Sequence, residues 1–429
     1  MQFHVLSFEG PDEYSRAGGL ASRIDGLTRT LAALGFETHL WFVGDPDRPG
    51  HETREGVRLH RWCQWLSRWH GGGVYDGEGP KRADYSTSLP PFLLEECLRP
   101  ALVGGGEAVV LAEEWQTADA LIGLHHRLCE AGLRERAALL WNANNVFGFD
   151  RIPWAPLRAA ATLTTVSRLM RHRMEPYGGR PLVIWNGLPP EAYELPERAT
   201  LLGLQDALAG RTALVKVARW DPDKDWLAAL RSVAHMRDEG LRPLLVARGG
   251  QEPHEAEVRE EARRLGLRWV DREPAQRGLR ALLDVLREPG DREILCLRFP
   301  LDSECTRALF RTADAVLANS AFEPFGLVGL ETMAVGGIAC TGLSGEDYAI
   351  PGRNALVIQS RDPGELTSLL RNLKARPDDE LALRRAARQT AMRFSWVEVV
   401  KRSLLPRVAL LRPASGPCSP APDEKEDLV

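Results

Sequence analysis

Short apolar runs alternate with amphipathic helical segments along most of the chain, and this alternation restricts the possible folds. In the segment 21–34, apolar residues at positions 24, 27, 31 and 34 fall on one face of a helix. The repeated order of strand, helix and strand predicts an α/β fold with parallel, doubly wound sheets. Ligands of such sheets bind beyond the carboxyl ends of the strands. Strands are predicted at 5–8, 38–43, 108–112, 139–142, 182–185, 214–218, 243–247, 313–317 and 338–341, and further helices at 226–239 and 254–265.

The chain of 429 residues is too long for one ordinary hydrophobic core. The alternation is lost in the proline-containing segment 187–210 and then resumes, so the domain junction is predicted there. We therefore predict an N-terminal domain over 1–190 and a C-terminal domain over 191–394.

The C-terminal end of the chain has a different composition. The segment 395–411 has the pattern of a final helix that is kinked or broken near Pro406, because proline cannot donate the helical hydrogen bond. Residues 412–429 hold four prolines and a charged end, and they are predicted to be disordered.

Composition and charge exclude several classes of protein. The net charge of −4 gives no reason to expect nucleic acid as a partner. The seven cysteines are scattered without a Cys-x-x-Cys pair, which argues against a disulfide framework and against a zinc site. Neither a signal peptide nor a transmembrane segment is expected from the apolar runs. These features favour a cytoplasmic protein with no metal site.

Two glutamates lie eight positions apart, at 323 and 331, on either side of a Pro-Phe-Gly turn. A buried strand is predicted before them and a helix over 327–335 after them. The backbone amides of Phe325, Gly326 and Leu327 at the start of this helix suit a phosphate group. A carboxylate further along can accept hydrogen bonds from the hydroxyls of a sugar. The segment therefore predicts a nucleoside diphosphate sugar as its ligand.

Four other segments accompany this one in a fixed order. They are Ala17-Gly18-Gly19-Leu20-Ala21, Thr164-Thr165-Val166-Ser167, Trp185-Asn186-Gly187-Leu188 and Val217-Ala218-Arg219-Trp220-Asp221-Pro222-Asp223-Lys224-Asp225. With the spaced glutamates, their order resembles that of the retaining GT-B glycosyltransferases. The similarity is to the family 4-like group-1 enzymes, which are related to glycogen synthase and sucrose synthase.

The resemblance implies an architecture and an activity. It implies two Rossmann-like domains that face a deep interdomain cleft, with the acceptor on the N-terminal side and the nucleotide sugar on the C-terminal side. The final helix would cross back to the first domain. The implied enzyme is a hexosyltransferase that moves a hexose, with retention, to a hydroxyl of a carbohydrate or small acceptor. Such enzymes use the nucleotide sugar as co-substrate and generally need neither a metal ion nor another cofactor.

The resemblance also implies roles for the residues that match it. Arg219 and Lys224 would bind the diphosphate, because a guanidinium can hold two phosphate oxygens and an ammonium is a compact charge. The amides of Gly18 and Gly19 could approach the same anion.

The two spaced glutamates receive different roles. Glu331 would hold the ribose hydroxyls of the nucleotide. Glu323, with Arg219 and Lys224, is predicted to be catalytic. It either holds the hydroxyls of the donor sugar or helps to stabilise the oxocarbenium-like centre.

One departure concerns Glu113, which stands where glycogen synthases carry the first histidine of their His-Asp-Trp-His-Thr strand end. Either Glu113 takes over a polar contact to the donor sugar, or the sugar sits differently. As a third alternative, Glu113 is a surface carboxylate at a strand end. With Trp115, it belongs to a candidate sugar or acceptor site. Asn142 and Asn144 either bind acceptor or donor hydroxyls or form a polar turn.

Two further alternatives stay open at this point. Trp62, Trp65 and Trp69 would share one face of a helix, as a core stripe or as an acceptor-binding surface. A non-catalytic protein that binds sugar nucleotides is the alternative to the enzyme. A dinucleotide oxidoreductase is excluded because no Gly-x-Gly-x-x-Gly follows the first strand.

Overall fold

The computed structural model describes residues 1–288, 290–342 and 344–410. The described chain forms two compact units, and the first consists of Met1–Gly187 with the segment 396–410. The second unit is Leu188–Ser395. The N-terminal segment of the first unit ends at Gly187, three residues before the boundary predicted at 190. The segment 187–210, predicted as a junction, contributes α8 (Arg198–Ala207) to the second unit. The tail 412–429, predicted to be disordered, lies outside the described residues.

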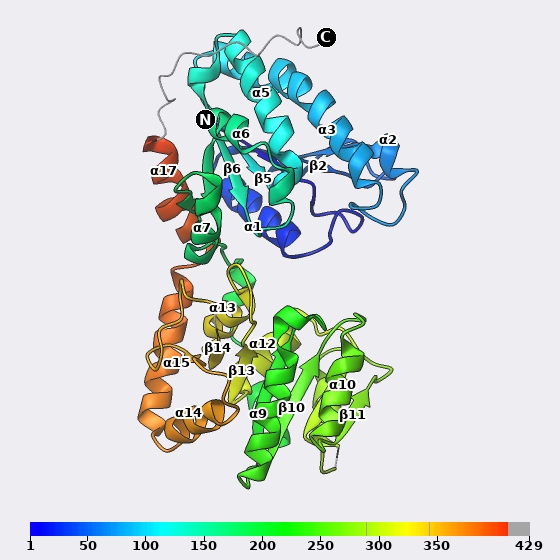
Figure 1. The fold of residues 1–429 in the computed structure, drawn as a ribbon, viewed down its shortest axis with the longest axis vertical. Helices are drawn as coiled ribbons and strands as arrows, with labels where there is room; N and C mark the ends of the chain where they lie inside the picture. Colours follow the sequence, from blue (N-terminus) through cyan, green and yellow to red (C-terminus); the bar gives the residue numbers. More distant parts are fainter. Residues whose placement is uncertain (289, 343, 411–429) are drawn as a thin grey trace, which may run out of the picture. The chain divides into compact units, whose positions relative to one another are not determined.

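In the described part of the first unit, one sheet of eight strands runs in the order β3-β4-β2-β1-β5-β6-β7-β8 (Figure 1). Neighbouring strands are parallel except for the β3–β4 pair at one edge, which is antiparallel. The doubly wound α/β prediction is confirmed. The strands are β1 (Gln2–Leu6), β2 (Glu37–Val43), β3 (His51–Arg54), β4 (Val57–Trp62), β5 (Ala108–Glu113), β6 (Ala137–Ala143), β7 (Thr162–Thr165) and β8 (Leu182–Val183).

Helices cover both faces of this sheet. On one face, α1 contributes Leu27 and Leu31 to a buried cluster that also contains Phe3 and Trp396. On the other face, α3 and α5 pack side by side (Figure 1). The main helices are α1 (Gly19–Ala33), α2 (Gln64–Ser67), α3 (Glu78–Phe92), α4 (Arg99–Val103), α5 (Ala118–Glu130), α6 (Trp154–Ala160) and α7 (Arg168–Met174).

The C-terminal segment of the first unit is helical up to residue 410. It consists of α16 (Trp396–Val399), a π-helical turn at Val400–Leu404 and α17 (Leu405–Leu410). The wide turn ends two residues before Pro406, near which an interruption was predicted. A π turn beside a proline is a known way to accommodate the missing N–H donor.

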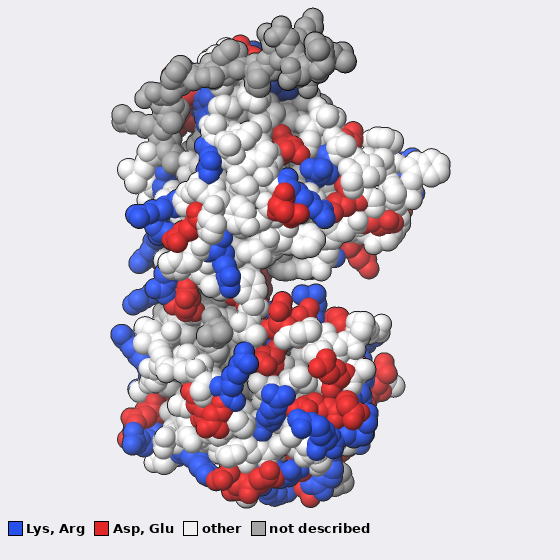
Figure 2. Space-filling view, in the orientation of Figure 1, with Lys and Arg blue, Asp and Glu red and all other residues white. Residues whose placement is uncertain are grey.

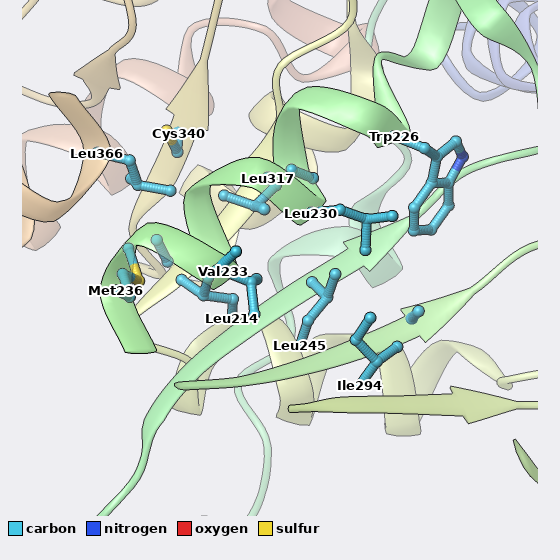
Figure 3. Packing of buried hydrophobic residues seen from close by; sticks show 14 of the residues in the cluster. Leu214, Trp226, Leu230, Val233, Met236, Leu245, Ile294, Leu317, Cys340 and Leu366 are labelled. Atoms are coloured by element: carbon cyan, nitrogen blue, oxygen red, sulfur yellow. The ribbon is translucent and has the colours of Figure 1, made fainter. Parts of the chain in front are cut away.

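The described part of the second unit has seven strands, all parallel, in the order β11-β12-β10-β9-β13-β14-β15. Buried apolar residues fill both faces. Figure 3 shows the cluster on the α9 side, with Trp226 at the start of that helix. The strands are β9 (Thr212–Val217), β10 (Pro243–Arg248), β11 (Trp269–Arg272), β12 (Ile294–Leu297), β13 (Ala315–Ala318), β14 (Ala339–Thr341) and β15 (Leu356–Val357). The remaining helices are α9 (Trp226–Asp238), α10 (Glu255–Arg264), α11 (Leu279–Arg287), α12 (Ser303–Thr312), α13 (Leu327–Ala334), α14 (Gly364–Lys374) and α15 (Pro377–Met392).

The helix expected across the three tryptophans is wrong. Trp62 is the last residue of β4, and Cys63 then adopts a left-handed φ of 56°. This conformation separates the strand from α2, so the three tryptophans do not share one helix. The core stripe is also wrong, because Trp65 is 61% exposed and Trp69 is 82% exposed.

On the face shown in Figure 2, acidic and basic side chains of the second unit are not separated into two patches. In Figure 2 acidic and basic side chains are interspersed over the second unit. Within the described ranges, every helix is too short or too polar to span a bilayer.

Candidate functional site

Two loops of the second unit meet at the carboxyl ends of the neighbouring strands β9 and β13. The backbone N–H of Ala321 donates to the carbonyl oxygen of Asp223 at 2.9 Å and joins the loops. Lys224 Nζ lies 3.3 Å from Oε2 of Glu323, and both side chains are largely buried. Ser320 Oγ donates to the same carboxylate oxygen at 2.8 Å. The fold thus brings together two of the three residues predicted to be catalytic.

Arg219, the third of these residues, is arranged differently. Its side chain is 68% exposed, and its guanidinium lies 3.8 Å from a carboxylate oxygen of Asp221. It borders a cavity of about 340 Å³ at the carboxyl ends of β9 and β10. The cavity lining includes Arg248, Gly249, Gly250, Leu301 and Thr306. Arg219 therefore stands beside a concave surface of the second unit with its charged end in solvent.

Helix α13 begins one residue after Gly326, which serves as its N-cap with a φ of 84°. Because no side chain caps this end, the first amides keep their capacity to bind an anion. The Tyr348 hydroxyl donates to the carbonyl oxygen of Gly326, and the Tyr348 ring packs against buried Phe325 at a centroid distance of 5.7 Å. The amides of Phe325, Gly326 and Leu327, which are predicted to bind an anion, thus lie on a turn that Tyr348 stabilises.

Glu331 lies in α13 and is half-buried. Burial raises the pKa of its carboxyl to about 7, and the negative charge of Glu323 acts in the same direction. The two glutamates of the spaced motif therefore share one electrostatic environment, and Glu331 titrates near neutral pH.

Sequence reasoning missed Lys216, a residue of β9 that is 1% exposed. Its Nζ donates to Asn319 Oδ1 at 2.6 Å and lies 5.3 Å from the centre of the Trp226 ring. Burial lowers the pKa of its ammonium to about 7. A lysine inside an apolar strand was the only signal in the sequence.

In the first unit, the glycine loop already binds a carboxylate. The N–H groups of Ala17, Gly18 and Ala21 donate to Oε2 of Glu9 at 3.3, 3.0 and 3.1 Å. The Gly18 amide predicted for the diphosphate thus has an internal partner. Apart from the adjoining residues and the backbone of α1, no described atom lies within 4 Å of a Cβ placed on Gly18 or Gly19, so packing against the rest of the protein does not require glycine there.

Glu113 is fully buried at the end of β5, so the surface-carboxylate alternative is wrong. Its carboxylate accepts from Arg23 Nε at 3.1 Å and from the side-chain amides of Asn142 and Asn144, both at 2.8 Å. Arg23 also donates to Asn186 Oδ1 at 2.6 Å. Three of the predicted sugar or acceptor residues are therefore connected, and they meet a buried arginine that sequence reasoning missed.

Glu114 and Trp115 follow directly on the same edge. Glu114 has a φ of 69°, unusual for a residue with a side chain, and burial raises its pKa to about 8. Its carboxylate accepts from the backbone N–H of Asn144 at 2.7 Å. Trp115 is buried, with the guanidinium groups of Arg82 and Arg151 over its ring.

Within the described residues, the structure also shows the arrangement of possible metal ligands and the state of five cysteines. Across residues 1–288, 290–342 and 344–410, no group of three or more His, Cys, Asp or Glu is arranged to hold a metal ion. Five of the seven cysteines, at positions 63, 97, 296, 305 and 340, are free thiols.

Sequence comparison identifies a limited similarity. No protein-family model matches this chain. Over 118 residues it is 32% identical to a D-inositol 3-phosphate glycosyltransferase from Corynebacterium urealyticum. The alignment covers 27% of this chain and 28% of that relative, so the chain matches little more than a quarter of the relative's length.

Solved structures match over nearly the full chain. Sucrose-phosphate synthase from Thermosynechococcus elongatus superimposes with a TM-score of 0.61 at 18% identity and covers 96% of this chain and 99% of that one. HepE from Anabaena, in complex with UDP, gives a TM-score of 0.62 at 15% identity and covers 96% of this chain and 100% of that one. With its two Rossmann-like parallel-sheet units, the chain therefore has the GT-B fold of these glycosyltransferases.

Proposed function

We propose that this protein is a retaining glycosyltransferase that moves a hexose from a nucleoside diphosphate sugar to a hydroxyl acceptor. UDP is the first nucleotide to test, because HepE, which shares the fold, was solved in complex with UDP. The observation that carries the proposal is the contact between Lys224 and Glu323, at 3.3 Å, on loops of adjacent strands. A basic group and a carboxylate at the carboxyl edge of a parallel sheet suit the diphosphate and the sugar of a nucleotide sugar.

Each group of the second unit has a distinct role in the proposal. Lys224 and Arg219 neutralise the diphosphate, together with the uncapped amides at the start of α13. Glu331 accepts hydrogen bonds from the ribose hydroxyls. Glu323 holds the donor sugar near its anomeric carbon.

Atoms and charge balance in the proposed transfer step. The bond between the anomeric carbon and the β-phosphate oxygen breaks, and its electron pair leaves with the diphosphate. The acceptor hydroxyl oxygen forms the new bond on the same face of the sugar, and its proton passes to the departing phosphate oxygen. The protein contributes fixed positive charge where negative charge develops, and no metal-dependent step is included.

A non-catalytic sugar-nucleotide-binding protein is the second candidate. The observation in its favour is that Glu9 occupies the Gly18 amide and carries a negative charge into the glycine loop. Donor binding without transfer to any acceptor would favour this candidate.

Thermal-shift measurements test the donor site. Purified protein is heated with UDP, ADP or GDP, and with their glucose and mannose conjugates, beside the variants Glu331→Ala and Lys224→Ala. A ligand at 100 times its Kd should stabilise the wild type by about 2.7 kcal/mol. We expect one nucleotide series to do so and both variants to lose the effect. No shift at millimolar concentration with any nucleotide would overturn the proposal.

A further inference from the structure

Lys216 is a buried basic residue that the proposed transfer step does not use. It lies in β9, the strand that leads into the loop 219–225, and is 1% exposed. Lysine is almost never fully buried unless its ammonium is paired, because the charge loses its hydration. The surroundings of this ammonium therefore require an explanation.

The partners of Lys216 belong to both loops of the candidate donor site. Its Nζ donates to Asn319 Oδ1 at 2.6 Å and, at 3.4 Å, to the carbonyl oxygen of Leu317, where β13 leads into the loop 319–325. Nζ of Lys216 also lies 5.3 Å from the centre of the Trp226 ring. Trp226 is the first residue of the helix that follows the loop 219–225. The ammonium thus contacts the base of each loop.

A short series of contacts leads from Lys216 to the donor residues. Asn319, which is 6% exposed, directly precedes Ser320, whose hydroxyl donates to Glu323 at 2.8 Å. The next residue, Ala321, donates its N–H to Asp223 in the other loop. A shift of Asn319 would therefore move both of these contacts.

We propose that Lys216 is a positioning residue for the donor site, because its ammonium holds the loops 219–225 and 319–325 in the arrangement in which Lys224 meets Glu323. The statement that Lys216 holds the two loops together rests only on its contacts with Asn319, Leu317 and Trp226. The statement that these loops bind a donor rests on the function proposed above.

The charged groups around Lys216 are compatible with this role. Asp225, Glu323 and Lys224 act on it electrostatically from the two loops, and Cys340 of β14 also acts on it. Its direct hydrogen-bond acceptors are an amide oxygen and a backbone carbonyl. The ammonium therefore orients neutral groups below the loops and leaves the carboxylate of Glu323 to Lys224 and Ser320.

Hydrogen exchange tests the bracing without any ligand. Lys216→Met keeps an unbranched side chain that is one heavy atom shorter, and it leaves Asn319 Oδ1 buried without its donor. We expect amides in 219–225 and 319–326 to exchange at least tenfold faster, with those of β10 and of the first unit unchanged. The matched control is Lys374→Met, which removes an exposed lysine paired with Asp314 at 2.8 Å. Unchanged exchange in both loops would overturn the proposal.

Calorimetric titration with UDP then tests the consequence for the donor site. We expect Lys216→Met to bind UDP about tenfold more weakly and Lys374→Met to bind it as the wild type does. Faster loop exchange with unchanged UDP affinity would overturn the positioning role. If the wild type itself binds no UDP while the loops loosen in Lys216→Met, the bracing stands and UDP as the donor nucleotide is wrong.

A double variant separates positioning from general stability. Lys216→Met with Asn319→Leu removes both polar partners, so the melting temperature should recover toward the wild-type value. We expect UDP affinity and slow loop exchange to stay lost, because nothing orients residue 319. Recovery of all three properties together would show a merely structural role and overturn the proposal.

Discussion

Lys224 Nζ lies 3.3 Å from Oε2 of Glu323, although the two residues are 99 positions apart (323 − 224) and follow different strands. The contact exists because β9 and β13 are parallel neighbours whose carboxyl ends reach the same edge of the sheet. A diphosphate bound by Lys224 would therefore lie beside the carboxylate proposed to hold the sugar.

Glu323→Gln should separate binding from transfer. The amide keeps a hydrogen bond to Ser320 but removes the negative charge that competes with a diphosphate for Lys224. We expect the UDP Kd, measured by calorimetry, to change by less than about threefold, while the transfer rate falls on the order of 100-fold. Equal losses of affinity and turnover would contradict the roles assigned to these two residues.

Glu331 should make folding stability depend on pH. Its pKa is raised from the ordinary value of 4.5 to about 7 in the folded protein, so the folded state holds a proton that the unfolded state releases. Stability should therefore fall as the pH rises from 4.5 to 7 and then level off. This cost is absent in Glu331→Gln.

Urea denaturation at pH 5, 6, 7 and 8 tests this pH dependence. We expect the stability advantage of Glu331→Gln over the wild type to grow across the range, to on the order of 2 kcal/mol at neutral pH. A difference between the two proteins that stays constant with pH would show that burial does not raise this pKa.

The buried pair of Arg23 and Glu113 should be far more important for stability than an exposed pair. Both side chains are at most 1% exposed, and removing one partner leaves an uncompensated charge. We expect Arg23→Met to lower the free energy of unfolding by about 3 kcal/mol or more. Arg371→Met, which removes an exposed pair with Glu239, should cost less than about 1 kcal/mol. Similar costs for the two variants in urea titrations would contradict this account.

Two glycines, one inside α1 and one at its N-cap, should differ in their tolerance of alanine. A Cβ on Gly26 would lie 2.1 Å from Nε1 of Trp396, so Gly26→Ala should destabilise the first unit by about 1–3 kcal/mol. No protein atom surrounds a Cβ on Gly18, so Gly18→Ala should melt within about 2 °C of the wild type. If a donor approaches Gly18, this variant should still bind UDP more weakly. Equal melting temperatures for both variants would disagree with the packing.

Most of the strands beside the loops 219–225 and 319–325 were predictable from the sequence because their signals are local. The apolar runs located nine of the strands of the described chain but not their order within the two sheets, and the spacing of Glu323 and Glu331 followed from one strand–loop–helix segment. The strands β3, β4, β7, β11, β12 and β15 were not predicted. β3 gives no apolar signal because His51–Arg54 is polar throughout, and β15 is only two residues long.

Contacts between distant residues could not be predicted. Arg23 and Glu113 are 90 positions apart, and nothing in α1 marks its arginine as buried. Glu9 occupies the Gly18 amide only because the segment between them folds back on itself. Lys216 reads as one polar residue in an apolar strand, and its role depends on β13, about 100 residues later.

Calorimetric titration of UDP into the wild type, Lys224→Met and Lys374→Met tests the central claim most directly. Lys224 is the residue proposed to bind the donor diphosphate, whereas Lys374 is an exposed lysine of the same unit. The account predicts that the wild type and Lys374→Met bind UDP equally, and that Lys224→Met binds it about 10- to 100-fold more weakly, the loss expected for a charge-assisted contact. Equal UDP affinity in all three proteins would contradict the assignment of these loops as the donor site.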